Sequence, residues 1–106
     1  MKRICTKKEF EQELQDAGDR LVAVDFTADW CTKNTEVRRK LTDVIYQTEF
    51  AEVVFLQVDV DDNQDTAPFC GVDFLPTIQF YRYGRKVDEL YEDSLDRLKS
   101  ILQLYR

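Results

Sequence analysis

Three stretches of the chain place hydrophobic residues at the spacing of an amphipathic helix. The stripes consist of Phe10, Leu14 and Ala17 in the first stretch, Val37, Leu41, Val44, Ile45 and Thr48 in the second, and Leu95, Leu98, Ile101, Leu102 and Tyr105 in the third. Thr6 and Glu9 form a capping box before the first helix, and Gly18 can end it. The second helix is expected to begin at Cys31, and Ser94 can cap the third.

Two nearly continuous apolar runs, residues 21–26 and 53–60, have the pattern of strands that are covered on both faces in a parallel sheet. Asp25 is the one acid of the first run and is therefore expected to be buried. Alternating runs at residues 77–83 and 86–91 lie on either side of a turn, and they predict an antiparallel hairpin.

Shorter elements complete the order. A first strand is expected at residues 4–5, and Asn63 can cap a brief helix that Pro68 should shorten or distort, because proline beyond the first turn removes a backbone donor. The order is βαβαβαββα, which right-handed crossovers turn into a mixed sheet between layers of helices. With no repeat or linker, residues 1–106 are expected to form a single domain.

The composition of the chain argues against a membrane protein and against a nucleic-acid-binding protein. Hydrophobic residues make up 43% of the chain and charged residues 34%, as in a soluble globular domain. No apolar run approaches the ~18 residues of a membrane span, and the N-terminal basic residues precede no apolar signal region. We therefore expect no membrane association and a cytoplasmic location. The net charge of −6 argues against binding to nucleic acid.

The chain has three cysteines, Cys5, Cys31 and Cys70, and no histidine. An odd number of widely spaced cysteines is a poor disulfide framework, and without histidine it is a poor zinc site. Free thiols in a reducing compartment fit this pattern best. No metal and no resident cofactor are expected.

Several stretches together resemble the thioredoxin family, in its cytosolic eukaryotic type. They are AGDRLVAVDF (17–26), ADWC (28–31), VVFLQVDVDDNQD (53–65), LPTIQFY (75–81) and YGRKV (83–87). The resemblance implies the α/β thioredoxin fold, with three α/β/α layers, a central mixed five-stranded sheet and four helices. It also implies a cis peptide bond before Pro76 and a buried Asp25.

The resemblance further implies a groove for protein substrates or partner peptides. Its substrate-binding residues would be Trp30, Thr32, Lys33, Leu75, Pro76 and Thr77. The catalytic positions would be Cys31, Asn34 and Asp25. In the family the buried acid exchanges a proton with a second cysteine, which this chain lacks, so a structural remnant is the favoured interpretation of Asp25.

The departure from the family lies at the reactive positions. Thioredoxins carry Trp-Cys-Gly-Pro-Cys, whereas this chain has Trp30-Cys31-Thr32-Lys33-Asn34. Free backbone N–H groups at a helix start favour a thiolate, and Lys33 adds to this while Asp29 opposes it. A Cys31 thiolate that attacks a disulfide forms a mixed disulfide, which a second thiol must resolve. Asn34 can hydrogen-bond a thiolate but has no sulfur.

The leading hypothesis is therefore one-thiol exchange, in which glutathione or a protein thiol resolves the intermediate. An efficient two-cysteine reductase is not expected. A redox-inactive module that binds peptides in the groove remains open, as do recruitment of Cys70 as the second thiol and a deliberately altered active site. Cys5 and Cys70 are more simply small buried residues, and the tyrosines at 81, 83 and 91 are most simply hairpin packing.

Overall fold

The computed structural model describes residues 1–31, 33–91 and 94–106, with only the backbone described at positions 33 and 34. Its strands are β1 (Lys2–Ile4), β2 (Val22–Thr27), β3 (Val54–Asp59), β4 (Thr77–Arg82) and β5 (Arg85–Leu90). Its helices are α1 (Lys7–Ala17), α2 (Lys33–Ile45), α3 (Thr66–Phe69) and α4 (Leu95–Tyr105), with a 3-10 turn, η1, at Thr48–Phe50.

The five strands form one mixed sheet in the order β1-β3-β2-β4-β5. β1, β3 and β2 are parallel, and β4 and β5 are antiparallel to their neighbours. In the register, Asp25 of β2 lies beside Gln57 of β3, and Phe26 lies beside Thr77 of β4. The predicted fold, including the hairpin, is confirmed.

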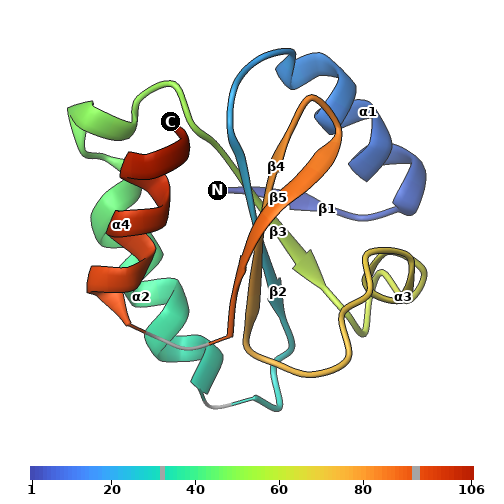
Figure 1. Ribbon diagram of the computed structural model, residues 1–106. Coiled ribbons are helices and arrows are strands. Elements are labelled where there is room, and N and C mark those ends of the chain that lie inside the picture. The colour runs from blue at the N-terminus through green and yellow to red at the C-terminus, as the bar shows by residue number, and fades with distance from the viewer. Residues whose placement is uncertain (32, 92–93) are drawn as a thin grey trace.

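The helices cover both faces of the sheet (Figure 1). α2 and α4 lie on one face, over a core of Leu21, Ala23, Val37, Leu41, Val44, Phe50, Val53, Phe55, Ile78, Phe80, Leu90, Leu98, Ile101 and Leu102. α1 and α3 lie on the other, over a core of Ile4, Phe10, Ala17, Val22, Val24, Phe26, Leu56, Val58, Ala67 and Tyr81. None of the helices in the described ranges is long and apolar enough to cross a membrane.

The predicted caps have a direct structural basis. The Thr6 hydroxyl accepts a hydrogen bond from the Glu9 backbone N–H at 3.0 Å, and the Ser94 hydroxyl accepts one from Arg97 N–H at 3.2 Å. Gly18 ends α1 with a φ of 59°, a conformation that favours glycine. These local bonds fix where the first and last helices begin.

Three predicted helix positions are wrong. α2 begins at Lys33 and not at Cys31, which lies in the turn before it. Thr48 does not continue α2, because the backbone becomes extended at Gln47 and then turns through η1, which carries Phe50 into the core. Asn63 does not cap α3, whose cap residue is Asp65. The Asn63 side chain is instead buried: it donates to the Ile4 carbonyl at 3.3 Å and accepts from the Thr66 hydroxyl at 2.8 Å.

Candidate functional site

Cys31 lies in the turn between β2 and α2. The strand ends at Thr27, the Cys31 N–H donates to the Ala28 carbonyl at 3.1 Å, and α2 begins two residues later. Trp30 is 67% exposed, and Cys31 is partly exposed. Figure 1 shows this turn at the lower end of the sheet. A molecule in solvent can therefore reach the surface around this sulfur.

The segment that leads into β4 reaches the same end of the sheet. Thr77 pairs with Phe26, one residue from the end of β2. The Leu75–Pro76 peptide bond is cis. Leu75 is partly exposed, whereas Pro76 and Thr77 are buried, and the Thr77 hydroxyl donates to the Phe74 carbonyl at 2.7 Å. Of the segment 75–77, Leu75 thus presents side-chain surface, and Thr77 holds the loop in place.

The structure brings together Trp30, Cys31 and the segment 75–77 at one end of the sheet. Asp25 lies two residues before the end of β2, and so slightly deeper in the sheet. Three other predicted site residues cannot be placed. Thr32 lies outside the described residues, and so do the side chains of Lys33 and Asn34. Their roles stay predictions from the sequence.

Asp25 is a buried acid on the face covered by α2. Its side chain is 1% exposed, and neither carboxyl oxygen has a hydrogen-bond partner among the described residues. Burial raises the pKa of Asp25 from 3.8 to about 7, because removal from water disfavours the charged form. The Arg38 guanidinium and the Gln57 side chain lower this pKa without offsetting burial. Gln57 acts from nearby without the geometry of a hydrogen bond.

Arg38 is a member of this region that the sequence did not single out. Its guanidinium Nη2 donates to the Thr27 hydroxyl at 3.1 Å, and its charge acts on Asp25. The only sequence feature that could have identified Arg38 is its position directly after Val37, which belongs to the buried stripe of α2. Because Thr27 and Asp25 point to the same face of β2, a cation at this position reaches both.

An exposed aromatic pair also lies at this sheet end. The ring centroids of Phe74 and Tyr91 are 5.0 Å apart, with an angle of 36° between the planes. Phe74 is 55% exposed and Tyr91 is 50% exposed. The expectation of hairpin packing is confirmed only for the Tyr91 hydroxyl, which donates to Glu89 of β5, because the Tyr91 ring contacts Phe74 in the loop before β4. The contact was not predictable from the sequence, because Phe74 and Tyr91 are 17 positions apart and no sequence pattern links them.

All three cysteines are free thiols. Cys5 is exposed, so the expectation that it is a small buried residue is wrong: it follows the end of β1 and lies outside the sheet. Cys70 is half-buried against the α1/α3 core. Burial raises the pKa of the Cys70 thiol, and the nearby Tyr81 hydroxyl and Lys86 only partly offset this. Cys70 therefore keeps its proton more firmly than a thiol in water.

Side-chain hydrogen bonds hold Cys70 against the hairpin. The Gln79 amide donates to the Cys70 carbonyl at 2.8 Å and to the Glu89 carboxylate at 2.8 Å. The Tyr81 hydroxyl donates to the Gln79 carbonyl oxygen at 2.5 Å. Tyr81 belongs to the α1/α3 core, whereas the helix that follows Cys31 covers the opposite face. The contacts of Cys70 thus lead away from the turn that carries Cys31.

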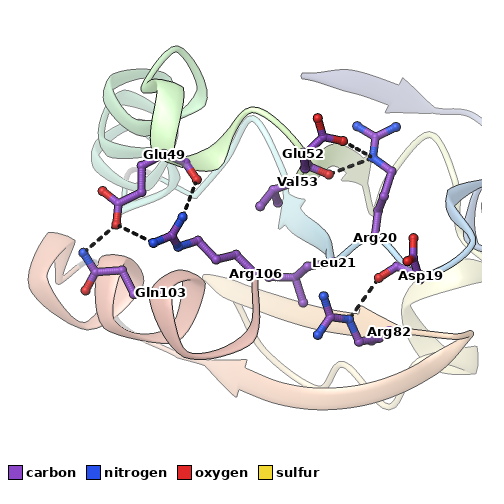
Figure 2. Close-up of a pocket in the computed structure, with 9 residues that line it drawn as sticks. All are labelled: Asp19, Arg20, Leu21, Glu49, Glu52, Val53, Arg82, Gln103 and Arg106. Carbon is purple, nitrogen blue, oxygen red and sulfur yellow. Dashed lines mark hydrogen bonds and ion pairs between the residues drawn. The ribbon is translucent and has the colours of Figure 1, made fainter.

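A hollow of about 490 Å³ lies at the other end of the sheet and is bordered by three arginines (Figure 2). Arg20, Arg82 and Arg106 each donate to a backbone carbonyl, at 2.7, 3.1 and 3.1 Å. Asp19, Glu49 and Glu52 also line the hollow, so its formal side-chain charges balance. These bonds join the C-terminal residue to η1, the segment before β2 to the segment before β3, and the end of β4 to the segment before β2. Within the described ranges, no cluster of acidic or cysteine side chains could hold a metal ion.

Comparisons with known proteins agree with this geometry. The thioredoxin family model matches residues 2–103. The chain is 40% identical to thioredoxin from Mus musculus over 108 aligned positions, covering 99% of this chain and 98% of that protein. It is 38% identical to thioredoxin from Equus caballus, covering 97% and 96%. The solved structure of Fasciola hepatica thioredoxin superimposes with a TM-score of 0.93 at 28% identity, covering all of both chains.

Proposed function

Because this chain belongs to the thioredoxin family, we propose that it carries out thiol–disulfide exchange through Cys31 alone, with an external thiol completing the cycle. Members of this family act on protein substrates through disulfide exchange. The observation that carries the proposal is a partly exposed Cys31 at the turn before α2, beside the segment 75–77, with asparagine at position 34.

In the first step the Cys31 thiolate attacks one sulfur of a substrate disulfide. A new S–S bond joins Cys31 to the substrate, the old S–S bond breaks, and the other substrate sulfur leaves as a thiolate that takes a proton from solvent. The product is a mixed disulfide. A thiolate is required because it, and not the thiol, is the nucleophile.

In the second step a glutathione thiolate attacks the Cys31 sulfur and releases the substrate as a dithiol. A second glutathione then attacks the Cys31–glutathione disulfide, which regenerates the Cys31 thiolate and forms glutathione disulfide. Two glutathione thiols are oxidised for each substrate disulfide reduced. Asn34 cannot replace them, because its amide has no sulfur.

Cys70 is a poor substitute for glutathione in this scheme. Its thiol has a raised pKa, so the thiolate fraction near neutral pH is low, and its backbone is bonded to Gln79. Resolving a mixed disulfide requires a thiolate with access to the bonded sulfur. Cys5 lies beyond β1, at the edge of the sheet that is two strands away from β2. Three free thiols favour a reducing location, and we place the protein in the cytoplasm.

Reduction of insulin disulfides tests the proposal. The wild-type chain should accelerate insulin reduction when glutathione is present and should be inactive with a thioredoxin-type reductase alone. The Cys31→Ser variant is the matched control, since it keeps Cys5 and Cys70. Its rate with glutathione should equal that of glutathione without protein. Wild-type activity with the reductase alone would contradict the one-thiol cycle, and equal rates for wild type and Cys31→Ser would leave Cys31 without a catalytic role.

A further inference from the structure

We propose that Asp73, Phe74 and Tyr91 form a subsite, called here the aromatic rim, that binds a lysine or arginine side chain beside the reacting cysteine of a protein partner. This inference rests on the proposed function, because it names a chemical feature of the same partner. It concerns residues that lie outside the Trp30, Cys31 and 75–77 positions described above.

The aromatic rim lies at the sheet end that carries Cys31. Tyr91 directly follows Leu90, which pairs with Ile78, the second residue of β4. Phe74 lies three residues before Thr77, the first residue of β4. Thr77 pairs with Phe26, the second-last residue of β2. A partner whose cysteine reaches Cys31 therefore has the aromatic rim within reach of its neighbouring residues.

The two rings present their surface to solvent. Each is at least half exposed, and they contact each other across the loop before β4 and the end of β5. Contiguous exposed aromatic surface is characteristic of sites where proteins bind partners. Two rings tilted against each other offer a shallow platform that a flat or elongated side chain can cover.

The charges around the rings favour a cation over an apolar side chain. The Tyr91 hydroxyl donates a hydrogen bond to the Glu89 carboxylate, which also accepts from Gln79 and from Lys86 at 3.2 Å. Burial raises the pKa of Glu89, but these hydrogen bonds outweigh it and hold the pKa below its ordinary value, so the carboxylate stays charged. A hydroxyl that donates to an anion enriches its ring in electrons, and the face of such a ring attracts cations.

Asp73 adds a second negative group at the same place. It is exposed, precedes Phe74, and its carboxylate acts on the Tyr91 hydroxyl. The one described cation bonded to this network, Lys86, is already paired with Glu89. Elsewhere in this chain an exposed phenylalanine has a cation above it: Lys7 Nζ lies 4.2 Å from the ring centroid of Phe69. The partner's lysine or arginine would supply the equivalent contact to the aromatic rim.

The test uses three cysteine peptides activated with thionitrobenzoate, which differ only in the residue next to cysteine: arginine, leucine or glutamate. The Cys31 thiolate displaces thionitrobenzoate, so one S–S bond forms, one breaks, and the coloured anion leaves with the electron pair. Rates measured with Cys31→Ser are subtracted to remove the contributions of Cys5 and Cys70. The variants are Asp73→Asn and the double variant Phe74→Leu with Tyr91→Leu. Asp19→Asn and Phe69→Leu are matched controls away from the aromatic rim.

With wild type, the arginine peptide should react about three- to fivefold faster than the leucine peptide, the range that exposed cation–π contacts support, and the glutamate peptide should be slowest. Asp73→Asn should reduce the arginine preference, and the double variant should abolish it. The leucine-peptide rate should stay unchanged, which shows that the Cys31 site is intact. Both controls should keep the full preference.

Three results would overturn the inference. Equal rates for the three peptides, or a fastest leucine peptide, would reject the aromatic rim as a cation subsite while leaving the proposed function in place. No reaction above the Cys31→Ser background would overturn the proposed function and this inference together.

Discussion

Replacing Asp25 with asparagine is expected to stabilise the folded protein at pH 8 by about 4 kcal/mol more than at pH 4. Burial raises the pKa of Asp25 from 3.8 to about 7 in the folded state. Between these two values the unfolded chain releases this proton and the folded chain keeps it. The contribution of Asp25 to the stability of the wild type therefore falls by about 1.4 kcal/mol for each pH unit over this range, and the loss levels off above pH 7.

Whether stability rises or falls with pH depends on whether the folded or the unfolded state binds more protons. A raised carboxyl pKa means that the folded state binds the extra proton, so stability falls as the pH rises from about 4 to about 7. An asparagine side chain has no such proton to lose, and it can meet the Gln57 side chain on the neighbouring strand as a neutral group. The variant should therefore be less sensitive to pH than wild type.

Urea denaturation in reducing buffer, at one-unit steps from pH 4 to pH 8, measures this difference. Subtracting the two curves cancels the titration of residues far from Asp25. Asp59→Asn is the matched control, because Asp59 is also buried but accepts hydrogen bonds from the N–H groups of Asp61 at 2.9 Å and Asp62 at 3.2 Å. It should not stabilise the protein at any pH. If the free energies of unfolding of Asp25→Asn and wild type differed by the same amount at every pH from 4 to 8, Asp25 would not be a buried carboxyl group with a raised pKa.

Replacing Asn34 with cysteine is expected to remove the need for glutathione. The new thiol would stand three residues after Cys31, in the first turn of α2, where it can attack the mixed disulfide from within the same molecule. Well-oriented groups in one molecule reach effective concentrations on the order of 10⁵ M, far above any external thiol. Release of the substrate should therefore change from dependent on glutathione to complete without it.

A single-turnover reaction with insulin shows the change. The Asn34→Cys variant should release reduced insulin and end with a disulfide between positions 31 and 34, whereas wild type should remain bonded to insulin. Asn34→Ser is the control, since serine is small and polar but cannot form a disulfide, and it should behave as wild type does. If the cysteine variant held its mixed disulfide as long as wild type, the account of the missing second thiol would be wrong.

The alternation of elements was predictable because each one has a local pattern. The stripe of α4 and the continuous run of β2 identified their elements, and Thr6 and Ser94 identified two helix starts. The same run made the burial of Asp25 predictable, because an acid between two apolar neighbours on a covered strand has no route to water. The end of α2 was not predictable, because glutamine, the residue at position 47, has no strong preference for an extended backbone.

The contacts at the site were less predictable because they join distant segments. Arg38 reaches Thr27 only through the packing of α2 on β2, and Phe74 meets Tyr91 only because β4 and β5 place the two loops together. No spacing along the chain encodes these pairs. The exposure of Cys5 also depended on where β1 ends, one residue earlier than its apolar character suggested.

The most direct measurement of the claim that Cys31 acts alone is intact-mass spectrometry of the reduced protein after reaction with a peptide cysteine activated by thionitrobenzoate, with no other thiol present. We expect peptide bound through Cys31, in an adduct that persists until glutathione is added and then disappears. An unmodified protein that carries a disulfide between Cys31 and Cys70, or peptide found on Cys5 and not on Cys31, would contradict it.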